Sequence, residues 1–283
     1  MIARYLFKKS FSFPPANENS ILSHSLDYSL TTNLYFLVNW LHDDKENQIS
    51  MFQKFKYQCF LQTNGNLRLT NTFVHNLGIQ HFFDSITRFN IDDNTLTSRI
   101  ELPIVKKLSF TFDSRITTRL MNGFDIKTND SGDLVRVLNS SFLTPLICTF
   151  SAGLGYSMKD IGSLSIGISA AKLTYILNRH IFEVRGIKSY YGIDEGDSHL
   201  LEYGLSFQIM IDKNILKLIH WNFDLLLFKN YNSRADLTVK NLFDLRLGKF
   251  FKTSFQTRVL YEEKLSRSLQ FENILSVGFN FQL

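Results

Sequence analysis

The residues of this chain that could do chemistry are seven histidines, two cysteines and a few serine-rich segments. No histidine lies in a His-Glu-x-x-His sequence, and Cys59 and Cys148 are too far apart for a Cys-x-x-Cys metal site. Ser163-Leu-Ser165-Ile-Gly167 is only loosely similar to a nucleophile elbow, because the Gly-x-Ser-x-Gly spacing fails. We therefore expect no catalytic residue, no metal and no cofactor.

The densest polar group is His220 with Asn222 and Asp224, three residues at alternate positions. Alternate residues of a β-strand point to one face, so the three side chains could meet. They could form a general-base cluster or a network of hydrogen bonds in a polar interior. We favour the network.

Alternation of apolar and polar residues identifies the elements that must position these groups. At the chain end, Phe271, Leu275, Val277, Phe279, Phe281 and Leu283 alternate with mostly polar residues. Period two predicts a β-strand with one apolar and one polar face. The same pattern recurs from about residue 34 onward. It predicts about twelve strands, at 33–42, 48–62, 66–79, 88–102, 107–120, 142–158, 162–176, 198–212, 215–229, 234–247, 250–262 and 269–283.

Composition favours a membrane protein that spans with strands over a soluble enzyme. The 283 residues include Phe 27, Tyr 11 and only Pro 4, a strand-friendly composition, with a mean hydropathy of -0.07. No segment reaches the ~18 continuous apolar residues of a spanning helix, whereas each expected strand has the ~9 to 11 residues that cross a bilayer. The net charge of +5 comes from scattered Lys and Arg, so we expect no nucleic-acid partner.

The connections add independent information, because longer and shorter ones alternate. Longer connections are expected at 43–47, 80–87, 121–141, 177–197, 230–233 and 263–268, and tight turns at 63–65, 103–106, 159–161, 213–214 and 248–249. Transmembrane barrels have short periplasmic turns and long outer loops. A soluble β-sandwich or lipocalin-like barrel is the alternative, and it gives no reason for this segregation.

We accordingly predict an all-β protein with a single closed antiparallel transmembrane β-barrel at 33–283. Residues 1–32 are expected to be an N-terminal periplasmic segment. The first residues are basic but lack the apolar core of an export signal, so we expect the true start to lie upstream.

Charges of both signs lie on the polar faces of the expected strands. Cations dominate the early strands and carboxylates the late ones. These charges could plug the interior, line a narrow pore with a transverse field, or form ion pairs that stabilise the barrel. The candidate lumen-lining residues are Lys54, Lys56, Arg68, Arg115, Arg119, Glu202, Asp224, Asp244, Arg246 and Arg258.

Short sequence signatures carry a family resemblance over about residues 34 to 283. They are Asn39-Trp40, Thr144-Pro145 leading into Gly153-Leu154-Gly155-Tyr156, Ser169-Ala-Ala-Lys172-Leu-Thr174, Tyr191-Gly192-Ile-Asp-Glu-Gly196, and Val277-Gly278-Phe279. The chain resembles an uncharacterised group of porin-like outer-membrane β-barrel proteins from Bacteroidota. It departs from the group at Leu41-His42-Asp43, where the group has a Gly-Gly pair, and lacks the proline of a Ser-Pro motif. The resemblance implies a barrel and transfers no residue role.

Three functions remain open for a barrel in the bacterial outer membrane. The first is a passive channel for small polar solutes. The second is a non-conducting barrel that binds a partner or stabilises an envelope complex. The third is a lipid-modifying enzyme, which would need a His and a Ser on one face, whereas Ser198-His199 would point to opposite faces. Expected partners are outer-membrane lipid and the machinery that assembles outer-membrane proteins.

Overall fold

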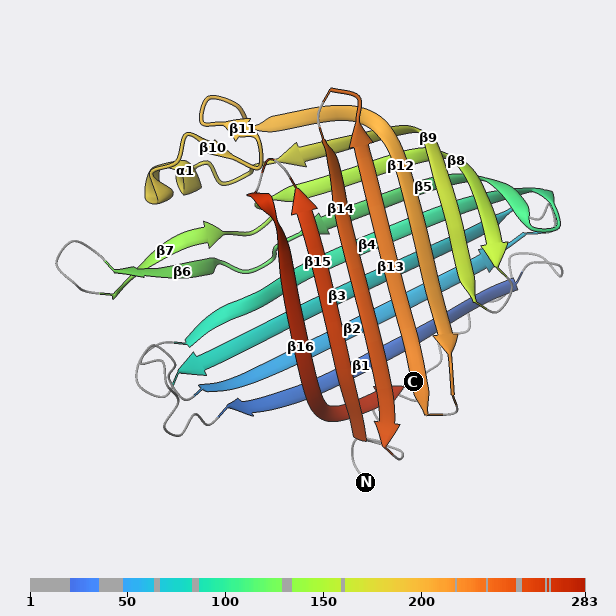
Figure 1. Cartoon of the computed structure of the whole chain (residues 1–283), viewed down its shortest axis with the longest axis horizontal. Coiled ribbons are helices and arrows are strands. Elements are labelled where there is room, and N and C mark those ends of the chain that lie inside the picture. Colours follow the sequence, from blue (N-terminus) through green and yellow to red (C-terminus); the bar gives the residue numbers. More distant parts are fainter. Residues whose placement is uncertain are drawn as a thin grey trace.

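Long antiparallel strands make up nearly all of the computed structural model of this chain (Figure 1). The structure describes residues 21–35, 48–63, 67–82, 87–128, 134–158, 161–216, 218–232, 234–247, 251–262, 264 and 266–282. The twelve long strands are β1 (Ile21–Tyr35), β2 (Gln48–Gln62), β3 (Arg68–Phe82), β4 (Thr87–Val105), β5 (Leu108–Thr118), β8 (Leu146–Met158), β9 (Gly162–Tyr175), β12 (His199–Asn214), β13 (Ile219–Asn230), β14 (Ala235–Leu247), β15 (Phe251–Glu262) and β16 (Ser266–Gln282).

These twelve strands form one antiparallel sheet in the order β1-β16-β15-β14-β13-β12-β9-β8-β5-β4-β3-β2. Because β1 pairs with β2 on one side and with β16 on the other, the hydrogen-bonded order returns to its start. The pairing of β1 with β16 is the shortest in the sheet, with five registered residue pairs from Asp27↔Gln282 to Thr31↔Gly278.

The first strand lies earlier in the sequence than predicted. We expected it at 33–42, but β1 begins at Ile21 and pairs with β2 over its whole length. Polar residues interrupt the apolar alternation of this segment, whose apolar positions are Leu22, Leu26, Tyr28 and Leu30. The alternation of the sequence therefore did not reveal this strand. The Asn39-Trp40 signature, expected at the end of that strand, lies outside the described residues.

The sheet buries polar residues and exposes apolar ones. In β12, Glu202, Ser206 and Gln208 are buried, while Leu201, Tyr203 and Leu205 are exposed. Among the described residues, buried side chains comprise nineteen polar or charged ones and seven apolar ones. A soluble barrel would show the opposite distribution, because apolar side chains leave water on folding. An apolar outer surface around a polar interior is the arrangement of a transmembrane barrel.

Two connections at one end of the sheet are elaborate. The connection between β5 and β8 contains the hairpin β6 (Gly123–Thr128) and β7 (Leu134–Ser140). The connection between β9 and β12 contains the helix α1 (His180–Arg185) and the short strands β10 (Ser189–Tyr190) and β11 (Ile193–Asp194). None of this local structure was predicted, because both segments were expected only as loops.

The loop between β9 and β12 has a small apolar core of its own. Ile176, Ile181, Phe182 and Ile193 are at most 2% exposed and form one cluster. Tyr190 Oη donates a hydrogen bond to the carbonyl oxygen of Asn139 in the other long loop at 2.6 Å. The two long loops therefore form a connected cap at one end of the sheet.

The opposite end has short turns, two of which are displaced from their predicted positions. β4 continues through Pro103 to Val105, which leaves the turn at Lys106-Lys107 rather than 103–106. β12 extends to Asn214 rather than ending at Asp212, and Ile215 N, beyond the strand end, donates to the Ile219 carbonyl oxygen at 2.9 Å. Within the described residues, no helix has the length and apolar character needed to span a membrane.

Candidate functional site: the polar interior

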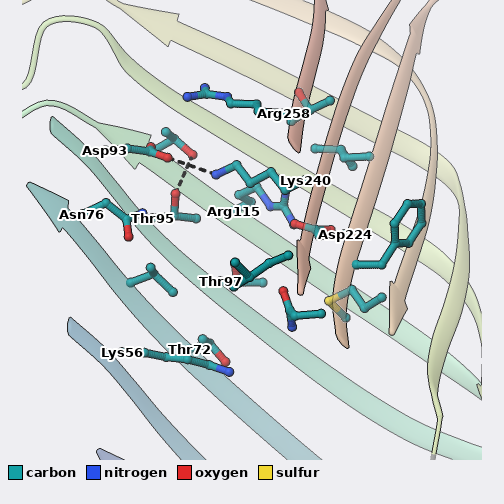
Figure 2. A pocket seen from close by; sticks show the side chains of 18 of the residues that line it. Lys56, Thr72, Asn76, Asp93, Thr95, Thr97, Arg115, Asp224, Lys240 and Arg258 are labelled. Carbon is teal, nitrogen blue, oxygen red and sulfur yellow. Dashed lines mark hydrogen bonds and ion pairs between the residues drawn. The ribbon is translucent and has the colours of Figure 1, made fainter. Parts of the chain in front are cut away.

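The interior of the sheet contains a cavity of about 660 Å³. Its walls are side chains of β2, β3, β4, β5, β8, β9, β12, β13, β14 and β15. Figure 2 shows how these side chains converge, with Lys56 and Thr72 on one wall and Lys240 and Arg258 on another. The wall is built by the period of the strands, because every second residue of each strand points inward.

Eight of the ten candidate lumen-lining residues lie on the cavity wall. They are Lys54, Lys56, Arg115, Arg119, Asp224, Asp244, Arg246 and Arg258. Arg68 and Glu202 are not among the residues that line the cavity. Glu202 is buried close to the cap, where it pairs with Lys264 and accepts a hydrogen bond from Asn230 Nδ2 at 2.6 Å.

Several ion pairs cross the interior between strands that are not neighbours in the sheet, and two of them link β5 to β13 and β14 to β4. Arg115 Nη2 of β5 lies 2.7 Å from Asp224 Oδ2 of β13. Lys240 Nζ of β14 lies 3.0 Å from Asp93 Oδ2 of β4, and five strands separate β14 from β4 in either direction around the sheet (Figure 2). These contacts narrow the interior and link walls that share no backbone hydrogen bonds.

Lys172 of β9 is the centre of a buried triad. Its Nζ lies 2.9 Å from Asp236 Oδ2 and 2.5 Å from Glu262 Oε1. Lys172 and Glu262 are 7% and 8% exposed and Asp236 is 19% exposed, so most of the triad is removed from water. An ion pair at this depth needs close hydrogen-bonding geometry to offset the cost of desolvation.

Arg99 of β4 forms a second buried network with polar groups of three other strands. It donates to Asp113 Oδ1 at 2.6 Å and to Gln208 Oε1 at 3.4 Å. It also donates to the hydroxyls of Ser163 and Ser165 at 2.6 and 2.9 Å. Ser163 and Ser165, the candidate nucleophile elbow, are thus hydrogen-bond acceptors for a buried guanidinium.

The histidine cluster considered from the sequence does not form as a unit. His220 Nε2 lies 3.2 Å from Asp212 Oδ1, and Asn222 Nδ2 lies 3.4 Å from Asp212 Oδ2. Asp224 instead pairs with Arg115. His220 and Asn222 therefore belong to a hydrogen-bond network around Asp212, and Asp224, which we expected in the same network, lies outside it. Among the described residues, no group of three or more His, Cys, Asp or Glu could hold a metal ion.

The cap reaches the interior through the turn between β10 and β11. Tyr191 at this turn lines the cavity, and the adjacent Gly192 has a φ of 76°. A Cβ added at Gly192 would lie 2.5 Å from Lys264 Cδ, so both the backbone conformation and the available space favour glycine. Burial raises the pKa of the Tyr191 phenol, so this side chain is uncharged at neutral pH.

Sequence reasoning missed Asp93, Arg99 and Lys172 as interior residues. A signal for Arg99 was present, because Thr97, Arg99 and Glu101 alternate with the exposed Leu96, Ile100 and Leu102. Lys172 follows Ala170-Ala171, which interrupts the alternation. A bulge at Ile168, between the pairs Ala152↔Ser169 and Gly153↔Gly167, also shifts the register by one residue just before this stretch.

No protein-family model matches this sequence, and no curated protein sequence matches it either. The resemblance to the Bacteroidota group therefore stays a prediction.

Solved structures of outer-membrane proteins are similar at low identity. The translocator domain of the autotransporter NalP from Neisseria meningitidis is 10% identical, with a TM-score of 0.39 and coverage of 95% of this chain and 90% of that one. An outer membrane channel from Pseudomonas putida F1 is 8% identical, with a TM-score of 0.41 and coverage of 96% and 100%. The β domain of the Bordetella autotransporter BrkA is 8% identical, with a TM-score of 0.34 and coverage of 94% and 100%.

Proposed function

We propose that this protein is a closed twelve-stranded β-barrel of the bacterial outer membrane and a passive, narrow channel for small polar solutes. The observation that carries the proposal is a polar cavity inside a sheet whose outer surface is apolar. Lipid can cover the outer surface, and each of the twelve long strands is long enough to cross a bilayer, since the shortest of them, β5, has 11 residues against the ~9 to 11 required.

Pairing of β1 with β16 supports closure in the membrane. An open edge in lipid would leave backbone N–H and C=O groups without partners, at a cost of several kcal/mol each. The five registered pairs between these strands provide such partners. The long loops then lie outside the cell, and the short turns lie in the periplasm.

The cavity sets the size of the solute. A volume of about 660 Å³ corresponds to roughly 20 water molecules at ~30 Å³ each. The Arg115–Asp224 and Lys240–Asp93 pairs divide this space. The channel therefore passes ions and small metabolites and excludes folded proteins.

A second candidate function is a non-conducting barrel that acts through its cap. The same ion pairs favour it, because they cross the interior, and Tyr191 occupies one end of the cavity. The connected loops would then present the surface that a partner binds.

Single-channel conductance of refolded protein in planar bilayers separates the two functions. The channel proposal predicts discrete openings of the wild-type protein and a larger conductance for Tyr191→Ala, since truncation widens the cap end of the cavity. Tyr231→Ala is the matched control, because Tyr231 is 62% exposed and does not line the cavity. If neither the wild-type protein nor Tyr191→Ala produced any channel openings, the result would instead support the non-conducting barrel.

A further inference from the structure

The cavity wall carries an excess of positive charge. The described side chains that line it include nine Lys or Arg and six Asp or Glu, which leaves three cations in excess. Charges in a confined, low-dielectric space are screened less than those on a surface. An interior of this kind attracts anions.

Lys54 of β2 is one of the cations that contribute to this excess. The charges that act most strongly on its ammonium group are those of Lys252, Asp244, Lys56 and Lys240. Each of the three neighbouring lysines has its own carboxylate partner. Lys252 Nζ lies 2.8 Å from Asp244, Lys240 Nζ lies 3.0 Å from Asp93, and Lys56 Nζ lies 3.6 Å from Asp212.

Lys54 itself forms no ion pair with any carboxylate of the described residues. Its backbone partner in β3 is Asn76, whose side chain also lines the cavity and offers an amide donor. Gln58 and Thr72 supply further polar groups farther along the same two strands, where Gln58 Nε2 lies 3.4 Å from Thr72 Oγ1. Lys54, Asn76 and the ion-paired lysines Lys56, Lys240 and Lys252 thus all line the same cavity.

We propose that this part of the cavity binds a small oxyanion such as phosphate or sulfate, with Lys54 as its principal cationic partner. The proposal rests on the channel function above, since it names the class of solute that the interior favours. Lysine suits this role because its compact ammonium group donates up to three hydrogen bonds to anionic oxygens. The paired lysines add attraction, and their carboxylates limit the charge of the anion that fits.

Isothermal titration of refolded protein with inorganic phosphate, and separately with sulfate, tests the site at constant chloride. We expect saturable binding by the wild-type protein and an affinity about tenfold lower for Lys54→Gln, the size expected for one lost charge-assisted hydrogen bond. Lys54→Arg should retain most of the affinity. Lys188→Gln is the matched control, since it changes net charge equally at an exposed position of the cap.

A thermal readout guards against a folding defect in Lys54→Gln. Without phosphate this variant should be at least as heat-resistant as the wild type, because it loses repulsion among four lysines. Phosphate should raise the unfolding temperature of the wild type more than that of Lys54→Gln at the same phosphate concentration, since a ligand stabilises the folded state in proportion to how tightly it binds.

Two results would overturn the site: no saturable binding of either anion by the wild type, or equal losses in Lys54→Gln and Lys188→Gln, which would indicate non-specific attraction. The bilayer experiment keeps the two proposals distinguishable. A conducting protein that binds no phosphate refutes the site and leaves the channel. Binding without conduction supports the site and refutes the channel.

Discussion

Arg99 provides the sharpest test of what a buried polar network contributes to the stability of this fold. Its side chain is 6% exposed, and that of its partner Asp113 is 13% exposed. Replacing Arg99 by Met removes four hydrogen bonds and leaves the Asp113 carboxylate without a cation. Arg99 does not line the main cavity, so the change leaves the proposed solute path intact.

The expected loss of stability follows from the burial of the pair. Removing one partner of a buried ion pair costs ~3 to 5 kcal/mol, mostly because the other charge remains buried. The double variant Arg99→Met/Asp113→Leu removes that charge as well. Replacement of a whole buried pair by apolar residues is often close to neutral. We therefore expect the double variant to be more stable than the single variant, by about 2 kcal/mol or more in the free energy of unfolding.

Urea unfolding of the protein in lipid vesicles, followed by tryptophan fluorescence, measures both variants. Lys188→Met in the cap is the control and should change the free energy of unfolding by less than ~0.5 kcal/mol, as exposed substitutions usually do. A loss below ~1 kcal/mol for Arg99→Met would show that water satisfies Asp113 and that the network contributes little. A double variant no more stable than the single one would refute the argument from an uncompensated charge.

Three further predictions concern how the protein is placed in the membrane and how its sheet closes. A spin label at Leu205 should be accessible to oxygen and shielded from a water-soluble quencher, and a label at Ser206 should show the reverse; the opposite result would place the apolar face inside a soluble protein. Epitope tags in the 119–145 connection should be reachable on intact cells and tags at 215–218 should not, unless the orientation is inverted. Deleting residues 279–283 removes most of the β1–β16 pairing, so we expect no folded protein in the membrane. If the truncated chain still showed the heat-modifiable gel mobility of a folded barrel, the argument from closure would be wrong.

The sequence by itself determined the class of fold and the polar face of several strands. Alternation in segments such as Leu201 to Ile211 placed polar and apolar side chains on opposite faces, and the structure has them there. This worked because the side-chain period of a strand is two, so each residue's face follows from its neighbours alone. Eight of the ten candidate lumen residues lie on the cavity wall for the same reason.

Only the tertiary structure decided which interior charges meet. Lys240 and Asp93 are separated by five strands in the sheet, and Lys172 reaches carboxylates of β14 and β15. Local periodicity carries no information about contacts across an interior, because these depend on how the sheet curves and on the stagger between its strands. The first strand was misplaced for a related reason. Its own alternation is weak, and its pairing with β2 and β16, which periodicity does not show, places it in the sheet.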